Sequence, residues 1–224
     1  HSPNSQSQPN NPSSSKQKSS KSNLYHMFIT IYGINNIGKT TQVKLLQENL
    51  EKQGYSVFSL KYPIYDIDPS GGFLHTVLRS RKQTISEAEL QMWFALNRYQ
   101  FQEKLSHFLA NYDVVLAEDY SNTAVAWGSC KGLDQTWIET INSKLTQPDL
   151  QILIHGERSL ETVEKGHIHE HQHDLSQQVA DKLMHMANKQ GWQIIQRQAK
   201  IQETQALLLS CIQSRLTAAK KPST

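Results

Sequence analysis

The 224-residue sequence contains few cysteines and no long apolar run. Its two cysteines, Cys130 and Cys211, form no CxxC pair, so neither a disulfide framework nor a zinc knuckle is predicted. No window approaches the roughly 18 consecutive apolar residues of a membrane span, and the first residues lack the apolar segment of a secretory signal. The sequence therefore predicts a cytoplasmic protein that does not bind membranes.

An excess of charge of one sign is also lacking once the N-terminal segment is set aside. The chain has 23 lysines and arginines and 20 acidic residues. Three of the lysines lie in residues 1–26, which contain no acidic residue, so the remaining body has 20 basic and 20 acidic side chains. A formally neutral body gives little support for binding a polyanion through a broad basic face, and nucleic acid is not expected as a partner.

Residues 1–26 form a low-complexity segment of Ser, Asn, Gln, Pro and Lys. Such a segment cannot bury enough apolar surface to offset its chain entropy. We expect a disordered tail over residues 1–26, one domain over residues 27–218 and a flexible C-terminus over residues 219–224.

Within the expected domain, short apolar runs alternate with helical patterns. Strands are expected at residues 27–33, 55–63, 113–119, 148–156 and 191–197. Helices are expected at residues 40–53, 73–79, 86–109, 137–145, 160–165, 177–190 and 201–216. This alternation predicts a three-layer α/β fold, in which a parallel sheet of about five strands is flanked by helices on both faces.

A glycine-containing loop follows the first expected strand. Residues 33–40, GINNIGKT, match the Walker A pattern GxxxxGK[ST] at every fixed position and precede an expected helix. Glycines let successive amides point at one anion, and the helix N-terminus adds a positive dipole end. Lys39 supplies a cation for the β and γ phosphates, and the Thr40 hydroxyl can ligate magnesium. The predicted ATP-binding residues are Gly33, Asn35, Asn36, Ile37, Gly38, Lys39, Thr40 and Thr41.

The loop therefore predicts a P-loop NTPase fold that binds a nucleoside triphosphate with Mg²⁺. The alternative is a glycine-containing turn between a strand and a helix that binds no ligand.

Beyond this loop, several segments resemble the thymidylate kinase family. They are FITIYGINNIGKTTQ, KYP, FALNRYQ, VVLAEDYSNTAVAWG and PDLQILI, in that order, and the resemblance runs from about Met27 to Leu209. It implies a nucleoside monophosphate kinase that transfers the γ-phosphoryl group of ATP to dTMP with Mg²⁺. It also suggests a homodimer. Catalysis would come from positioning and charge neutralisation rather than from covalent chemistry.

Carried over residue by residue, the resemblance implies that Phe94 stacks on the thymine ring and that Arg98 contacts the acceptor nucleotide. Core packing for Phe94 and a surface ion pair for Arg98 are the alternatives. Asn35 stands where the family usually has an aspartate near the acceptor sugar, and it can still bond a hydroxyl. The predicted acceptor-binding residues are Asn35, Tyr62, Phe94, Arg98 and Tyr120, and the predicted catalytic residues are Lys39, Arg98 and Glu118.

The chain departs from the family after the third expected strand. Family members usually show Asp-Arg-Tyr there, whereas this chain has Glu118, Asp119 and Tyr120. Glu118 can still hold magnesium together with Thr40, but Asp119 reverses the charge of an arginine expected to grip the acceptor phosphate. The arginine usual just after Pro63 is also missing.

The expected lid segment, EKGHIHEHQHD, is the third departure, because it lacks the arginines that would neutralise the transferring group. The cations that could compensate are Arg79, Arg81, Arg158 and Lys165. The alternating His167, His169, His171 and His173 lie on one side only if the stretch is extended. They fit a solvated lid, a lid whose imidazolium forms replace arginines, or a metal site. No metal ligand beyond Thr40 and Glu118 is predicted.

Two other functions fit these departures. A deoxynucleoside kinase, whose acceptor has no phosphate, would not need the missing arginines. It would need a carboxylate after the second strand, where Asp66 is the nearest candidate. A noncatalytic nucleotide-binding protein would keep the loop and lose the transfer chemistry.

Overall fold

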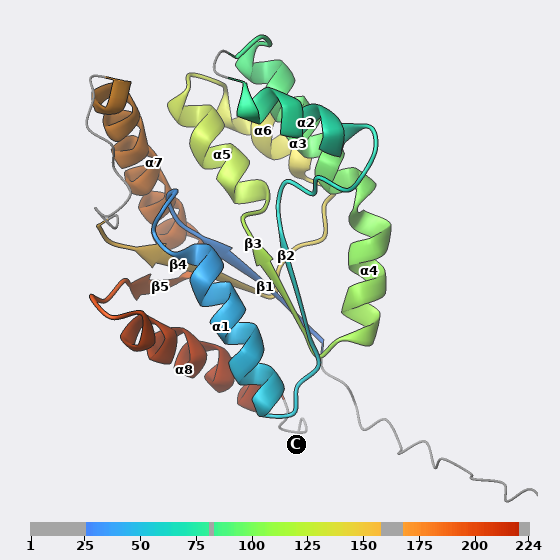
Figure 1. Ribbon diagram of the computed structural model, residues 1–224, viewed down its shortest axis with the longest axis vertical. Helices are drawn as coiled ribbons and strands as arrows, with labels where there is room; N and C mark the ends of the chain where they lie inside the picture. Colours follow the sequence, from blue (N-terminus) through green and yellow to red (C-terminus); the bar gives the residue numbers. More distant parts are fainter. Residues whose placement is uncertain (1–25, 81–82, 158–167, 220–224) are drawn as a thin grey trace, which may run out of the picture.

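The computed structural model describes residues 26–80, 83–157 and 168–219, and its centre is a five-stranded parallel sheet (Figure 1). The sheet has the order β2-β3-β1-β4-β5, and each neighbouring pair is parallel. The sheet of about five strands that the sequence predicts is confirmed. Its strands are β1 (Met27–Tyr32), β2 (Val57–Lys61), β3 (Val114–Glu118), β4 (Leu150–His155) and β5 (Gln193–Gln196).

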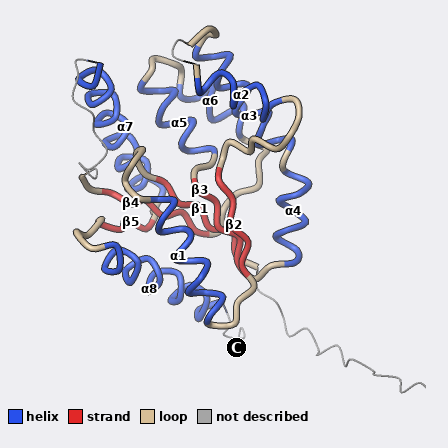
Figure 2. Tube along the Cα trace, viewed as in Figure 1, coloured by secondary structure: helices blue, strands red, loops and turns tan. Residues whose placement is uncertain are grey.

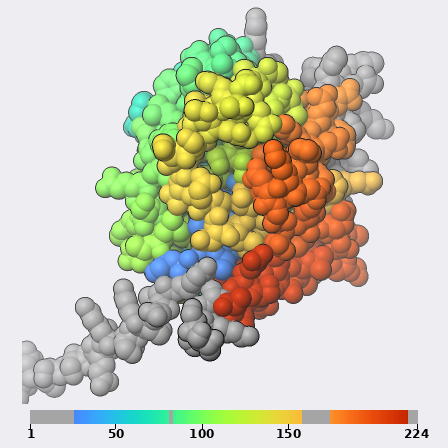
Figure 3. Space-filling model, turned by 180° about the vertical axis from the view of Figure 1, so that it is seen from behind, coloured from blue at the N-terminus to red at the C-terminus, as the bar shows by residue number. Residues whose placement is uncertain are grey.

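Helices cover both faces of this sheet (Figure 2). On one face α1 (Lys39–Lys52) packs against α8 (Ile201–Ala219), and on the other α4 (Gln102–Asn111) contacts β3 and α7 (Ile168–Gln190) contacts β4. Seen from behind, α3 to α6 form one side of the surface in green and yellow, and α7 and α8 close the other side in orange and red (Figure 3). The helices that gather beyond the carboxyl end of β3 are α2 (Ser70–Arg79), α3 (Glu87–Gln100), α5 (Ser121–Cys130) and α6 (Gln135–Asn142).

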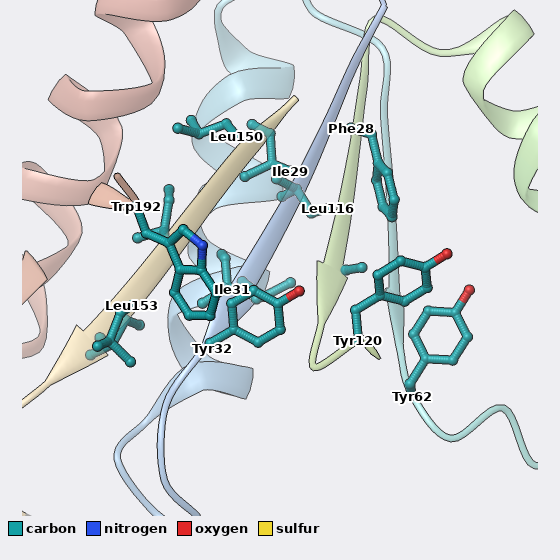
Figure 4. Packing of buried hydrophobic residues seen from close by; sticks show 14 of the residues in the cluster. Phe28, Ile29, Ile31, Tyr32, Tyr62, Leu116, Tyr120, Leu150, Leu153 and Trp192 are labelled. Carbon is teal, nitrogen blue, oxygen red and sulfur yellow. The ribbon is translucent and has the colours of Figure 1, made fainter. Parts of the chain in front are cut away.

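The central strands are buried along their whole length. Every residue of β1 and β3 is buried, as expected for strands covered on both faces. Tyr32 at the end of β1 stacks on Trp192 with ring centroids 4.8 Å apart (Figure 4). Phe28 meets Tyr120, just beyond β3, edge to face at 5.4 Å. This packing fixes the carboxyl ends of β1 and β3, where the polar side chains of the site begin.

Two helix ends have the geometry of caps. The Ser86 hydroxyl accepts a hydrogen bond from the amide of Glu89 at 3.1 Å, which caps α3. Gly54 lies beyond α1 with a φ of 89°. Within the described part of the chain, no helix is both long enough and apolar enough to cross a membrane.

The single helix predicted over residues 86–109 is wrong. The chain forms α3 and α4 instead, with a break at Phe101. Phe101 is buried, and its ring lies near those of Tyr62 and Phe108, at 6.1 and 6.2 Å. We attribute the break to this packing, which competes with continuation of the helix.

Other helix boundaries differ as well. The sequence pattern does not predict α5, because buried Ala124, Val125, Ala126 and Gly128 give it no clear polar face. α2 begins at Ser70 rather than at residue 73, and α7 begins at Ile168 rather than at residue 177. The helix predicted over residues 160–165 and nearly all of the predicted tail lie outside the described residues.

Candidate active site

A cavity of about 870 Å³ opens beside the carboxyl ends of β2 and β3 and the loop after β1. Parallel α/β sheets bind ligands at this edge, and the volume suits a small-molecule site. Most of the residues that the sequence predicts for nucleotide binding line it together. They are Asn35, Asn36, Gly38, Lys39, Thr40, Thr41, Tyr62, Phe94, Arg98 and Glu118.

The loop between β1 and α1 has the backbone conformation of an anion cradle. Gly38 has a φ of 101° and Asn36 a φ of 63°, both in the left-handed region. A Cβ atom on Gly33 would lie 2.8 Å from the carbonyl oxygen of Ile154, so glycine is required between β1 and β4. α1 begins directly after Gly38, and its first amides and positive dipole end face the loop.

Lys39 lies inside this loop and is only 5% exposed. Its Nζ atom donates hydrogen bonds to the carbonyl oxygens of Gly33 at 2.8 Å and Ile34 at 3.1 Å. Among the described residues, its ion-pair partner is Asp119, at 3.7 Å. The ammonium group is therefore fixed within the loop and lines the cavity.

Two candidate magnesium ligands lie in contact at the edge of the loop. The Thr40 hydroxyl donates to Oε1 of Glu118 at 2.9 Å, and Glu118 is buried at the end of β3. Closely placed oxygen atoms suit Mg²⁺, which commonly binds through one or two protein ligands and the substrate phosphates.

Lys61 completes this cluster, although it is not among the site residues predicted from the sequence. Its Nζ atom lies 2.7 Å from Oε1 of Glu118 and 3.2 Å from Oγ1 of Thr40. Lys61 and Glu118 are register partners on β2 and β3. A signal was present in the sequence, because Lys61 ends a parallel strand, at the edge where ligands bind.

Asp119, the charge reversal, lies between β3 and α5 with a φ of 59°. Its Oδ1 atom accepts a hydrogen bond from the Thr123 hydroxyl at 2.9 Å, and Oδ2 faces Lys39. Burial raises the pKa of the Asp119 carboxyl, and the opposing effects of Lys39 and Thr123 are smaller. A carboxylate thus lies beside the lysine of the phosphate loop and offsets part of its charge.

Arg98 and Phe94 line the cavity from one face of α3, with the guanidinium carbon 6.0 Å from the centre of the Phe94 ring. Arg98 is 4% exposed, and its Nη1 atom donates to Oδ1 of Asn142 at 3.1 Å. Within the described ranges no carboxylate forms an ion pair with it, and its Nε atom has no hydrogen-bond partner. Burial lowers the pKa of this guanidinium.

A buried charge that lacks an opposite charge is costly, so this part of the cavity favours an anionic ligand. Neither core packing of Phe94 nor a surface ion pair of Arg98, the two alternatives to nucleotide binding, fits the structure in full. Arg98 is not on the surface, and Phe94 is only partly buried and faces the cavity.

The predicted residues Gly33, Ile37 and Tyr120 do not line this cavity. Tyr120 is completely buried, with its ring beside that of Tyr62 at 5.1 Å (Figure 4). Its hydroxyl accepts a hydrogen bond from Gln102. Tyr120 thus packs against Tyr62 and has no exposed surface that an acceptor could contact. Its predicted contact with the acceptor does not fit this position.

The wall also contains residues that no strong sequence signal marks. Lys131, directly after α5, pairs with Glu87 on α3 at 2.9 Å, and both residues line the cavity. Thr123 and Trp127 come from α5, a helix that the sequence pattern does not predict, so the direction of their side chains could not be inferred. The remaining wall residues of this kind are Tyr65, Leu78, Leu90, Gln91 and Ala124.

A second cavity of about 170 Å³ adjoins the phosphate loop. It shares Asn36, Gly38 and Thr41 with the larger cavity, and its other wall is the segment between β5 and α8. The wall residues of that segment are Arg197, Gln198 and Ala199, and Ile201 and Thr204 of α8 continue the wall.

Several other predicted features lie away from the site or outside the described residues. Arg79 and Asp66 are exposed and do not line the larger cavity. The backbone of residues 168–173 is helical, so the extended conformation that would align the histidines is not found there. In the described part of the chain, no three His, Cys, Asp or Glu side chains are grouped so that they could hold a metal ion. The positions outside the described residues are Arg81, Arg158, Lys165 and His167.

Comparison with known proteins gives a consistent result. The family model described as Thymidylate kinase matches residues 31–208. The probable thymidylate kinase of Sulfurisphaera tokodaii is 27% identical over 184 residues, which cover 79% of this chain and 90% of that protein.

Two solved structures share the fold at 19% sequence identity. The thymidylate kinase of Ehrlichia chaffeensis superposes with a TM-score of 0.70 over 84% of this chain and 99% of its own. The Candida albicans enzyme superposes with a TM-score of 0.71, over 85% and 92%. With its Walker A loop and the model match over residues 31–208, the chain belongs to the thymidylate kinase family of nucleoside monophosphate kinases.

Proposed function

We propose that this protein transfers the γ-phosphoryl group of ATP to dTMP. Membership of the family supports ATP as donor and a nucleotide as acceptor. The observation that carries the proposal is one cavity with two sites for anions. It is lined both by the phosphate loop with Lys39 and by the buried Arg98, which lies beside Phe94 and has no carboxylate partner among the residues that the structure describes.

The donor would bind along the loop. The amides of residues 33–41 and the Lys39 ammonium would hold its phosphates, with Gly33 and Ile37 contributing through their backbone. The smaller cavity continues from the same loop residues, so we place the donor base there, beside Arg197.

Thr40 and Glu118 would hold Mg²⁺, because their oxygens lie 2.9 Å apart at the cavity wall. A Mg²⁺ ion held there would supply positive charge that neutralises the phosphates of ATP.

The acceptor would occupy the part of the cavity near α3. Phe94 offers an aromatic face to the thymine ring, Arg98 pairs with the acceptor's negative charge, and Tyr62 closes the wall next to them. Asn35 at the exposed edge of the loop can bond a sugar hydroxyl.

In the reaction, a lone pair on an oxygen of the dTMP phosphate forms a bond to the γ-phosphorus of ATP. The bond from that phosphorus to the β,γ-bridging oxygen breaks, and its electron pair leaves on ADP. The acceptor oxygen needs no general base, so the described residues act by positioning and by neutralising charge.

We also propose that the chain forms a homodimer through the outer face of α3. Met92, Leu96 and Tyr99 are 51%, 39% and 37% exposed and are spaced four and three residues apart, so they share one side of the helix. Light scattering on the wild type and on the Met92→Lys, Leu96→Lys double variant tests this pairing. A wild-type mass of one chain would refute it.

The domain boundaries at residues 27–218 and the cytoplasmic location stay predictions of the sequence.

The decisive test of the function is a coupled assay of ADP release with dTMP, dUMP, other nucleoside monophosphates and thymidine. We expect release that depends on dTMP. Release that depends on thymidine alone would favour the deoxynucleoside kinase, and ATP binding without release for any acceptor would favour a noncatalytic nucleotide-binding protein.

A further inference from the structure

The departures from the family raise the question of which cation neutralises the phosphate charge at the site. An arginine that the family would place at position 119 is replaced by Asp119, which cannot neutralise a phosphate. Four basic residues line the large cavity in the described part of the chain: Lys39, Lys61, Arg98 and Lys131.

Three of these residues are already engaged. Lys39 is fixed in the loop by two backbone carbonyls, and Lys131 is paired with Glu87 at 2.9 Å. Arg98 is buried beside Phe94 and bonded to Asn142, where it serves the acceptor. Lys61 differs from them, because its side chain is 57% exposed and its carboxylate partner, Glu118, is itself a candidate magnesium ligand.

We propose that Lys61 is a catalytic residue that exchanges Glu118 for the phosphates when magnesium binds. Its ammonium bonds Oε1 of Glu118 and Oγ1 of Thr40, the two oxygens that we assign to Mg²⁺. The Lys61 ammonium would lose these two partners to a metal ion held there, and the positive charge of the metal would repel it. The ammonium then turns on its flexible stem to the nearest strong negative charge, which is the phosphate chain on the same metal.

The exchange places a mobile positive charge beside the transferring phosphoryl group, where the lid arginines of similar enzymes act. Lys61 neutralises charge and transfers no proton, so the bond changes are those of the transfer to dTMP given above. The expected effect of Lys61 on turnover rests on the proposed function. The competition between Lys61 and magnesium for Thr40 and Glu118 does not require an acceptor nucleotide.

Two Lys61 variants and one control test the exchange. Lys61→Met keeps the length of the stem without the charge, and Lys61→Arg keeps a charge. The control is Lys104→Met on the exposed side of α4, away from the cavity. The readouts are kcat and KM for dTMP, and calorimetric titration of Mg²⁺ into protein saturated with ATP.

In Lys61→Met we expect kcat to fall at least about 30-fold, a smaller effect than that of an arginine finger. We expect Lys61→Arg to recover kcat to within about fivefold of the wild type, as a charge-based role requires. The Mg²⁺ concentration for half-saturation should fall about threefold or more in Lys61→Met, because the competing ammonium is gone. A purely structural lysine would not produce this tighter magnesium binding.

Unchanged magnesium binding in Lys61→Met overturns the exchange, and so does a kcat within about threefold of the wild type. Equal loss of kcat in both Lys61 variants also overturns it. If the wild type fails to phosphorylate dTMP, the proposed function fails, and the magnesium titration still decides whether Lys61 competes for Thr40 and Glu118.

Discussion

Replacing Asp119 by asparagine should strengthen ATP binding. Asparagine keeps the shape of the side chain and tolerates the φ of 59°. Its side-chain oxygen can still accept the hydrogen bond from Thr123, so the start of α5 is preserved. The substitution therefore removes one negative charge from the neighbourhood of Lys39 and changes little else.

The size of the effect follows from the distance between Asp119 and Lys39. Their charged atoms are 3.7 Å apart. A phosphate oxygen bonded to Lys39 would lie about 3 Å beyond its nitrogen, and so roughly 6 Å from the carboxylate. Repulsion of one unit charge at that distance is about 0.7 kcal/mol in a water-like medium and about 2.8 kcal/mol at an effective dielectric constant of about 20. We expect the Kd for MgATP to fall about tenfold, within a range of roughly 3-fold to 100-fold.

Calorimetric titration of MgATP into the wild type and Asp119→Asn measures this change. Asp181→Asn, on the exposed face of α7, is the matched control and should leave the Kd unchanged. Unchanged or weaker ATP binding in Asp119→Asn would refute the reasoning that Asp119 competes with phosphate for Lys39.

Asp119→Asn should also change how the free energy of unfolding depends on pH. Burial raises the pKa of Asp119 above its ordinary value of 3.8, so the folded protein holds this proton more tightly than the unfolded chain does. The wild type therefore loses this contribution to stability as pH rises from below 3.8 through the raised pKa. Asp119→Asn does not lose it. The difference in the free energy of unfolding, variant minus wild type, should grow with pH across that window in urea titrations.

Three other substitutions test separate parts of the account. Arg98→Met should raise KM for dTMP at least about tenfold, because the acceptor loses its buried cation, while calorimetry shows unchanged MgATP binding. Glu118→Gln should raise the Mg²⁺ concentration for half-maximal activity about tenfold, since the site loses its charged ligand; an unchanged value places the metal elsewhere. Gly71→Ala should lower the free energy of unfolding by about 1–3 kcal/mol in urea, because the new methyl group would clash with the Tyr65 carbonyl; full stability would contradict the tight packing of α2.

Most of the fold could be predicted from the sequence, because its signals are local. Each strand is a short apolar run bounded by turn residues, and the alternation with helices implies a parallel sheet. The errors occur where tertiary contacts decide. Phe101 interrupts a helix to bury its ring, and the small apolar residues of α5 lack the period of an amphipathic helix.

The phosphate loop could be predicted because its chemistry is contiguous in sequence. Lys61 is different, since its role depends on the pairing of β2 with β3, which places it opposite a residue 57 positions away. Tyr120 illustrates the reverse case, because a family motif marks the position but only packing shows that its ring is buried. Contacts between distant segments thus decide which polar residues reach the cavity.

We propose that the amides of the loop and the ammonium of Lys39 form the binding site for the phosphates of ATP. Calorimetric titration of MgATP into the wild type, Lys39→Ala and Lys44→Ala tests it most directly, since Lys44 lies on the exposed side of the same helix. We expect Lys39→Ala to weaken MgATP binding at least about 30-fold and Lys44→Ala to bind MgATP like the wild type. Wild-type affinity in Lys39→Ala would contradict it.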